Sequence, residues 1–388
     1  MEIAELVETF RQYLYLPDPG PVEVVVATVV ANRLPGDPVW LLLVGPPASG
    51  KTEVLNSLSE LPGVIFVSNF TRAGLLSGST DPRSTGGLLA QIGQEGVLCL
   101  KDFTSVLSES ADLRQKLLGD LREIYDGLWV RDLGNRKLWW QGKAGLVGAV
   151  TETIDRHSAL IGSMGERLLF YRLPALDDDG RLAQGRAALA NVGRQDAMRH
   201  DLSAAVARYF EELALPSEAV PLDGPVADFL VPLADLATRC RSVVERDARD
   251  RAVELVPQDE ALGRLQAQLG QLVRAFAVMG LGDEGTRTLV EVALGSMPKL
   301  RRQVVETLAS LPVGIGRQTA WFADVLGFPT APVGRALEDL AAHSVCQRDT
   351  SARVHIWSPT EWLRTRWAEL GLAVTEVPEE VNDNDEAY

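Results

Sequence analysis

The chain has 388 residues, of which 46% are hydrophobic and 23% are charged, and its formal net charge is −15. This composition is typical of a soluble globular protein with two or three domains, and no apolar run reaches the roughly 18 residues that a membrane span needs. The negative balance disfavours non-specific binding of nucleic acid by the chain as a whole.

Two helical patterns, residues 2–15 and 22–33, precede the unbroken apolar run 39–44. Such a run between turn residues is typical of a strand that is buried on both faces. The same pattern recurs at 64–69, 97–100, 144–150 and 167–173. Helical stretches such as 110–127 lie between most of these runs, and the alternation predicts an α/β fold with a parallel sheet and helices on both faces.

The first predicted strand leads into a glycine-rich sequence in which Gly45 is followed by four residues and then by Gly50, Lys51 and Thr52. The spacing G-x-x-x-x-G-K-[ST] between a strand and a helix predicts a phosphate-binding loop. Its backbone N–H groups can converge on phosphates, Lys51 can reach the β and γ phosphates, and the Thr52 hydroxyl can bind Mg²⁺. The predicted nucleotide-binding residues are Gly45, Pro46, Pro47, Ala48, Ser49, Gly50, Lys51 and Thr52. The expected ligands are ATP and Mg²⁺.

The sequence GPPASGKT at 45–52 resembles the phosphate loop of the AAA+ ATPases. Residues 120–151 resemble one branch of that family, in which a β-hairpin precedes the fourth core strand; the branch includes the minichromosome-maintenance helicases, enhancer-binding activators and several viral helicases. LWVRD and RKLWW would be the two arms and LGN the turn. Arg131, Arg136 and Lys137 would then lie near the tip and contact a nucleic-acid backbone. The alternative is an ordinary exposed hairpin with solvated charges.

The third predicted strand ends in Lys101 and Asp102, where the family usually has Asp followed by Glu. The usual Asp binds Mg²⁺ through water and the usual Glu polarises the attacking water, so this chain departs from the family at its hydrolytic centre. In one interpretation Asp102 performs both tasks at a slipped strand end and Lys101 turns outward. In the other, Lys101 enters the site, repels Mg²⁺ and leaves a protein that binds ATP but scarcely hydrolyses it. The retained motif residues favour the first interpretation.

Three further positions follow from the resemblance. Thr151 would be the sensor-1 residue that orients the attacking water. Arg167 would be the arginine finger that reaches the γ-phosphate of a neighbouring subunit, with a surface salt bridge as the alternative. Arg239 and Arg241 are candidates for the sensor-2 residue, and Arg241 is the one assigned to the nucleotide. Asp102, Thr151 and Arg167 therefore form the predicted catalytic set, with Thr52 and Asp102 as the predicted Mg²⁺ ligands.

Residues 317–326 and 330–343 read as two helices joined by a turn that contains Gly327, and two β-like arms follow. The whole resembles a winged-helix domain, in which Thr330, Arg335, Arg348 and Arg353 would face DNA. The segment from Met297 to Trp367 has nine Lys/Arg and six Asp/Glu, so it is only mildly basic. A winged helix that contacts only protein is therefore the alternative.

We expect five segments: a helical N-terminal segment 1–38, an AAA+ core 39–174, an all-helical lid 175–285, a winged helix 286–370 and an acidic, disordered tail 371–388. The start of the chain lacks the layout of a secretory signal. Cys99, Cys240 and Cys346 are widely spaced, as in buried thiols of a cytoplasmic protein, which is the expected location.

The resemblance implies an ATPase that assembles as a ring, a hexamer in this family, with ATP between subunits. Its expected task is ATP-driven work on DNA as a helicase, loader or remodeller. A nucleotide-gated regulatory switch is the main alternative, with little hydrolysis and a winged helix that binds DNA or a protein partner. A third interpretation is an ATPase that remodels proteins, with the hairpin gripping polypeptide.

Overall fold

The computed structural model describes residues 1–68, 70–75, 87–133, 136–163, 167–247, 249, 251–257, 262–349, 351 and 354–374. The chain divides into two compact units. The first comprises residues 1–157, 166–222 and 267–292, and the second comprises 158–165, 223–266 and 293–388. The predicted disordered tail lies outside the described residues from position 375 onward.

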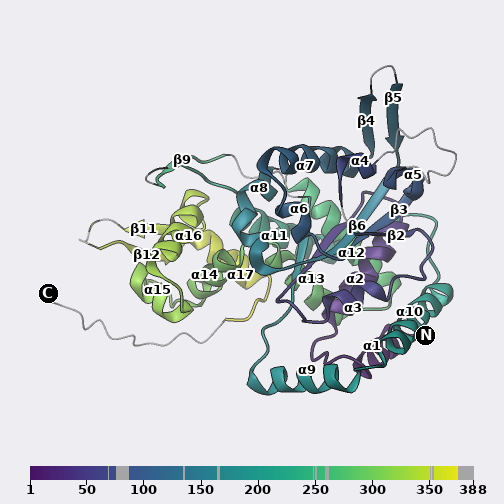
Figure 1. Cartoon of the computed structure of the whole chain (residues 1–388). Helices are drawn as coiled ribbons and strands as arrows, with labels where there is room; N and C mark the ends of the chain where they lie inside the picture. The colour runs from purple at the N-terminus through teal and green to yellow at the C-terminus, as the bar shows by residue number, and fades with distance from the viewer. Residues whose placement is uncertain are drawn as a thin grey trace. The chain divides into compact units, whose positions relative to one another are not determined.

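A parallel sheet of five strands forms the centre of the first unit (Figure 1). The strands are β1 Trp40–Val44, β2 Val64–Val67, β3 Glu95–Leu100, β6 Lys143–Val150 and β7 Leu169–Arg172. Their order in the sheet is β2-β3-β6-β1-β7, and each neighbouring pair is parallel. The structure therefore confirms the predicted α/β class and all five predicted strands. Because parallel strands end at one edge, the segments after β1, β3 and β6 meet there.

The longer helices of the first unit are α1 Ile3–Arg11, α2 Gly20–Arg33, α7 Ala111–Tyr125, α9 Asp178–Ala190 and α10 Gln195–Glu212. Short helices are α3 Lys51–Asn56, α4 Arg72–Leu75, α5 Leu88–Ile92, α6 Thr104–Leu107 and the 3₁₀ helix η1 Glu152–His157. Helices α12 Gly263–Val278 and α13 Asp283–Gly295 contain residues of both units.

Helix α2 is buried along nearly its whole length and packs against β1, β3 and β6. Its valines have low helix propensity, but a helix that is apolar on all sides is stabilised by burial. Asn32 connects it to the sheet, because its side-chain amide donates to the Val39 carbonyl at 2.9 Å and its oxygen accepts from the Val39 N–H at 2.9 Å. This pairing fixes the start of β1, the strand that leads into the predicted phosphate loop.

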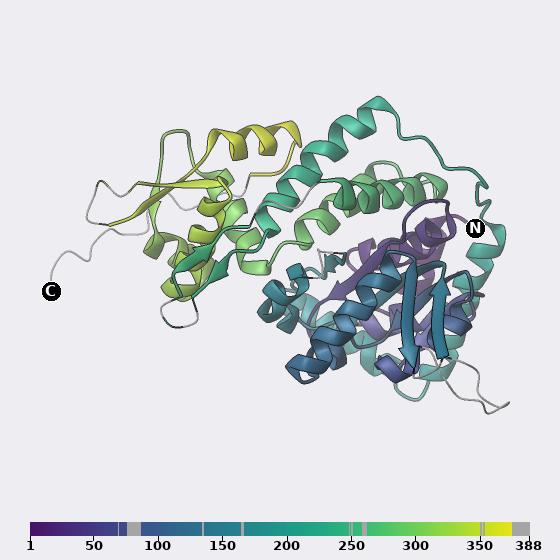
Figure 2. The same ribbon diagram turned by 90° about the horizontal axis from the view of Figure 1, so that it is seen from above.

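The predicted hairpin is present as β4 Leu128–Leu133 and β5 Arg136–Gln141, although its turn lies outside the described residues. Figures 1 and 2 show that it projects from the first unit beside α7. Trp129 and Trp140 face inward and are buried, and the Trp129 indole N–H donates to Asp120 of α7 at 3.2 Å. The opposite face carries Val130 and Trp139, and the Trp139 side chain is 64% exposed.

The second unit contains a three-stranded antiparallel sheet in the order β10-β12-β11. Its strands are β10 Arg317–Gln318, β11 Cys346–Asp349 and β12 Ile356–Pro359, and its helices are α8 Ser158–Ser163, α11 Gly224–Arg241, α14 Lys299–Ser310, α15 Thr319–Leu326, α16 Thr330–Ala342 and α17 Glu361–Glu369. Two short strands, β8 Glu245–Arg246 and β9 Val253–Leu255, interrupt the middle region that was predicted to be helical throughout. That prediction was wrong there because pairing across a turn overrides local propensity.

The three cysteines are buried and unbridged, as predicted. Burial raises the pKa of the Cys99 and Cys346 thiols to about 12, so they are inert at neutral pH. Within the described ranges, none of the helices combines the length and the apolar character that crossing a bilayer requires.

Candidate functional site

The loop between β1 and α3 has a backbone that only certain residues can adopt. Gly50 has φ +85°, in the left-handed region that favours glycine, and Ala48 has φ +60°. At Gly45 a Cβ atom would lie 2.8 Å from the Leu173 side chain, so a larger residue would force that side chain to shift. The Gly45 N–H donates to the Val150 carbonyl at 3.2 Å, which joins the loop to the end of β6. Left-handed residues interspersed in a loop can form a concavity of backbone N–H groups that receives anions.

Lys51 lies inside this loop and is 8% exposed. Its ammonium donates to the Gly45 carbonyl at 2.8 Å, the Pro46 carbonyl at 2.6 Å and the Ser49 hydroxyl at 3.0 Å. Burial lowers its pKa, and the negative charges of Asp102 and Glu152 oppose that shift. All three of its hydrogen-bond partners are neutral oxygens, so an anion that entered the loop would be a stronger partner.

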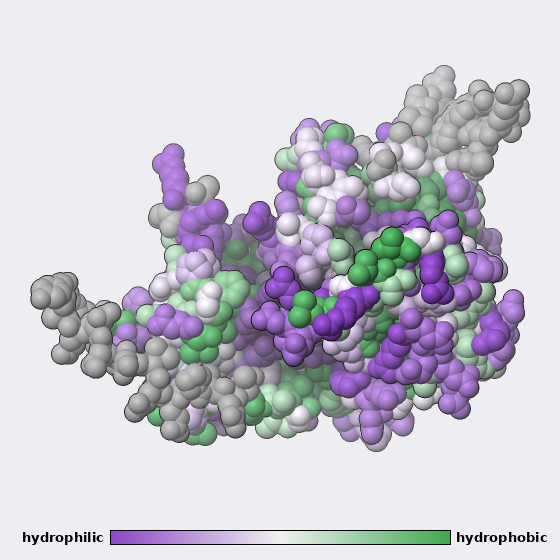
Figure 3. Space-filling model, turned by 60° about the horizontal axis from the view of Figure 1, so that its bottom comes forward, coloured by the Kyte–Doolittle hydropathy of each residue, from purple (hydrophilic) through white to green (hydrophobic). Residues whose placement is uncertain are grey.

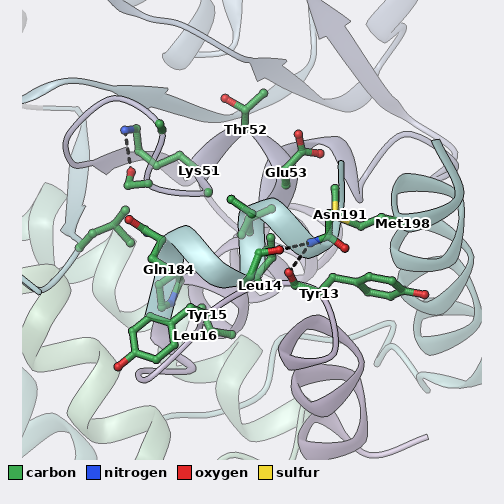
Figure 4. A pocket seen from close by; sticks show the side chains of 18 of the residues that line it. Tyr13, Leu14, Tyr15, Leu16, Lys51, Thr52, Glu53, Gln184, Asn191 and Met198 are labelled. Carbon is green, nitrogen blue, oxygen red and sulfur yellow. Dashed lines mark hydrogen bonds between the residues drawn. The ribbon is translucent and has the colours of Figure 1, made fainter. Parts of the chain in front are cut away.

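A cavity of about 380 Å³ opens next to the loop. Its size falls in the range of small-molecule sites, about 300–1,000 Å³. The walls come from the segment Tyr13–Leu16, from the loop and α3, and from α9 and α10. Figure 4 shows Lys51 and Thr52 at one end of the cavity and Tyr15 and Leu16 at the other. One end is therefore polar and cationic, and the other is aromatic and aliphatic.

Helices α9 and α10 are joined to the other walls by specific polar contacts. The Asn191 side chain, just after α9, donates to the Tyr13 carbonyl at 2.7 Å. Arg199 of α10 donates to both carboxylate oxygens of Glu53, at 2.8 and 2.9 Å. These hydrogen bonds lower the pKa of Glu53, and the charge of Lys101 adds to the effect. The outward side of α9 carries exposed leucines, and Figure 3 shows apolar patches among polar side chains on the side it brings forward.

The end of β3 carries Lys101 and Asp102, the two residues at which the sequence departs from the AAA+ pattern. Leu100 pairs with Gly148, and the Phe103 N–H donates to the Ala149 carbonyl at 2.8 Å, so Lys101 and Asp102 are looped out of the ladder. Both are exposed. The Lys101 ammonium lies 5.3 Å from the centre of the Phe66 ring, and Asp102 accepts the Thr104 N–H at 2.8 Å.

The end of β6 brings Thr151 and Glu152 to the same edge. The Thr151 hydroxyl lies 2.6 Å from the Thr153 hydroxyl. The sequence interpretation did not select Glu152, although its charge acts on Lys51 together with that of Asp102. It also did not select Tyr13–Leu16, which lie far from the loop in sequence. An acid directly after the polar residue that ends a buried strand was the available signal for Glu152; none existed for Tyr13–Leu16.

Arg167 does not extend from the surface as an arginine finger must. It is 5% exposed and donates to both carboxylate oxygens of Asp126, at 2.8 and 2.9 Å, and its guanidinium lies 5.4 Å from the Tyr125 ring centre. In this conformation the alternative interpretation, a salt bridge, describes its geometry: the Arg167 side chain is buried, whereas the Asp126 side chain is 52% exposed. An arginine held in this way would have to break the pair before it could contact a neighbouring subunit.

The remaining predicted contacts are dispersed. Arg241 ends α11 and is buried in the second unit, so its assignment to the nucleotide stays a prediction. In the hairpin, Lys137 is exposed and Arg131 is partly exposed, whereas the side chain of Arg136 is not among the described ones. Among the described residues, no group of three His, Cys, Asp or Glu side chains gathers as in a metal site.

The predicted DNA contacts of the second unit occupy a surface of mixed charge. Thr330, Arg335 and Arg348 are exposed, and Arg353 lies outside the described residues. On α16, Asp339 accepts from Arg246 and Arg301, and Glu338 also accepts from Arg246. The α16 acids thus neutralise nearby arginines. The sequence of the chain matches no protein-family model, and no curated protein matches it significantly.

Proposed function

We propose that the chain binds ATP in the cavity beside Lys51, with the triphosphate on the loop 45–52. The observation that carries the proposal is the buried Lys51 ammonium at the polar end of a ligand-sized cavity. Phosphate oxygens are charged and form stronger hydrogen bonds to an ammonium than the neutral oxygens that hold Lys51 here. The backbone N–H groups around the left-handed Ala48 and Gly50 support the same ligand class.

The base of the nucleotide would occupy the aromatic and aliphatic end of the cavity. Tyr13, Leu14, Tyr15 and Leu16 line it, together with Ala187 and Met198. Apolar walls with a few polar groups are the usual environment of a flat heteroaromatic ligand. Thr52 and Asp102 would hold the Mg²⁺ that accompanies the substrate, and this ion would neutralise charge on the β and γ phosphates.

We further propose that the protein is an ATPase of the AAA+ class from the hairpin-containing branch, working on DNA. The parallel sheet, the hairpin directly before β6 and the C-terminal sheet next to α15 and α16 are consistent with that resemblance, the last of these with a winged helix. The hairpin face with exposed Trp139 and Lys137 supports nucleic acid as the polymer, because bases stack on aromatic rings and phosphates pair with cations. A ring oligomer, a hexamer in the family, is part of this proposal.

A nucleotide-gated switch is the second candidate, and the presence of a lysine at position 101, instead of an acid, favours it. A cation beside the expected Mg²⁺ position opposes metal binding and therefore hydrolysis. The observed position of the Lys101 side chain favours the first candidate instead. Its ammonium lies over the Phe66 ring and its charge helps to lower the pKa of Glu53, so it has favourable partners other than the expected Mg²⁺ site.

Phosphate release and nucleotide binding, measured without DNA, with single-stranded DNA and with duplex DNA, test the two candidates together. A DNA-dependent motor predicts binding of ATP and turnover that DNA stimulates. A switch predicts binding of ATP and DNA with negligible turnover. Turnover indifferent to DNA would favour remodelling of proteins, and absence of ATP binding would contradict every version of the proposal.

A further inference from the structure

Two carboxylates, Asp102 and Glu152, stand at the edge of the sheet where the loop 45–50 begins. Asp102 follows β3 and Glu152 follows β6, and these strands are neighbours. Val150, two residues before Glu152, pairs with Val44, the last residue before the loop. Both carboxylates are exposed, and the negative charge of each raises the pKa of Lys51.

Asp102 is held by the turn that begins α6. One of its carboxylate oxygens accepts the Thr104 N–H at 2.8 Å, and its carbonyl accepts the Ser105 hydroxyl at 2.8 Å. It is also the neighbour of Lys101 in the looped-out pair at the strand end. These contacts fix the position of the Asp102 carboxylate at the strand end, where it can serve as a metal ligand.

Glu152 is the first residue of η1, and the 3₁₀ helix is anchored on both sides. Ile154 is 1% exposed and its N–H donates to the Thr151 carbonyl at 3.1 Å. Asp155 accepts two hydrogen bonds from Arg172 of β7, at 2.6 and 2.9 Å. These contacts fix the backbone from which the Glu152 side chain extends, and a rigid supporting turn is what a group that must orient a small reactant requires.

We propose that Glu152 is the carboxylate that orients and deprotonates the attacking water, whereas Asp102 serves the metal; this rests on the proposed ATP site. The water oxygen forms a bond to the γ-phosphorus as the bond from that phosphorus to the β–γ bridging oxygen breaks. The bonding electron pair leaves with ADP, and the proton lost by water passes to the Glu152 carboxylate. The products are ADP, inorganic phosphate and a proton.

The test compares Glu152→Gln with the wild-type protein in nucleotide affinity and in turnover. A general base contributes about 10²–10⁴-fold, so turnover should fall by about 100-fold or more. The affinity for an ATP analogue with Mg²⁺ should stay within about threefold, because Glu152 contacts water rather than nucleotide. Glu152→Asp should recover part of the turnover. Asp102→Asn should instead raise the Mg²⁺ concentration needed for half-maximal turnover.

Asp112→Asn is the matched control, because Asp112 is an exposed carboxylate on α7 away from the loop, with its side chain 88% exposed. It should change neither affinity nor turnover. If Glu152→Gln binds the analogue and turns over within threefold of wild type, Glu152 is not the base. If the wild-type protein binds ATP but does not hydrolyse it, the inference falls while the binding proposal stands. If the wild-type protein binds no ATP, both fall.

Discussion

Strands β1 and β3 end at the same edge of one sheet, yet their ends are built differently. After β1 the loop 45–50 surrounds Lys51, which is buried and whose ammonium has three oxygen partners; we call this the closed end. After β3, Lys101 and Asp102 lie outside the strand pairing and are exposed; we call this the open end. At the closed end the Lys51 side chain is buried and held before any ligand arrives, whereas at the open end both charged side chains are exposed. Binding and hydrolysis therefore depend on separate parts of this edge, and substitutions should affect them separately.

The largest expected effect comes from the closed end. Lys51→Ala should weaken binding of ATP with Mg²⁺ by about 100-fold, because a hydrogen bond to a charged group contributes about 1.5–3 kcal/mol. Titration with a fluorescent ATP analogue measures this. Lys116→Ala removes an exposed lysine of α7 and is the matched control. If Lys51→Ala bound ATP as tightly as the wild-type protein, the closed end would not be the part of this edge that binds the nucleotide.

The hairpin of β4 and β5 follows the open end in the chain, after α6 and α7, and it is the proposed contact with nucleic acid. Trp139→Ala should weaken binding of single-stranded DNA by about tenfold, because stacking of a base on an aromatic ring contributes about 1–3 kcal/mol. ATP affinity without DNA should not change. Leu189→Ala, at a 73% exposed leucine of α9, is the control. If Trp139→Ala and Leu189→Ala both bound single-stranded DNA as tightly as the wild-type protein, the hairpin would not be the DNA contact.

A smaller effect is expected from the open end itself. Lys101→Asp replaces a cation by a carboxylate near the expected Mg²⁺ position, so turnover should rise by several-fold, up to about tenfold. The Kd for ATP should change little, because the loop and Lys51 are intact. Phosphate release at saturating ATP checks this. A decrease in turnover would mean that Lys101 itself takes part in the reaction.

The smallest effect concerns the ion pair that joins α10 to the closed end. Arg199 lowers the pKa of Glu53, so the pair stabilises the fold above the unfolded pKa of Glu, near 4.3, and this contribution is lost as pH falls through the folded value. Arg199 is 46% exposed, so the contribution is at most about 1 kcal/mol. Glu53→Gln should lower the Tm by about 1–2 °C at pH 7 and not at pH 3. The same difference at both pH values would contradict the assignment to the charge.

The residues that the sequence singled out at the closed end have a backbone geometry that explains the residue types found there. Gly50 has a left-handed φ, and a side chain at Gly45 would require Leu173 to shift, so glycine suits both positions. The five strands were predictable because each is an apolar run that the sheet buries.

Features that depend on distant residues were not predictable in this way. Tyr13–Leu16 reach the cavity only because α1 and α2 pack beside the sheet and α10. The partner of Arg167, Asp126, is 41 positions away in the sequence. Glu152 acquires its place next to Asp102 only when β3 and β6 become neighbours. Each of these arrangements is a product of tertiary packing, which local sequence does not specify.

Calorimetric titration of the wild-type chain with a non-hydrolysable ATP analogue and Mg²⁺ tests the central claim most directly. A triphosphate held by Lys51 and the loop 45–52 predicts one site per chain with a Kd of about 1–100 μM. In Lys51→Ala the affinity should fall by about 100-fold while the folded state, followed by circular dichroism, is unchanged. No binding to the folded wild-type protein at about 1 mM analogue would contradict the account.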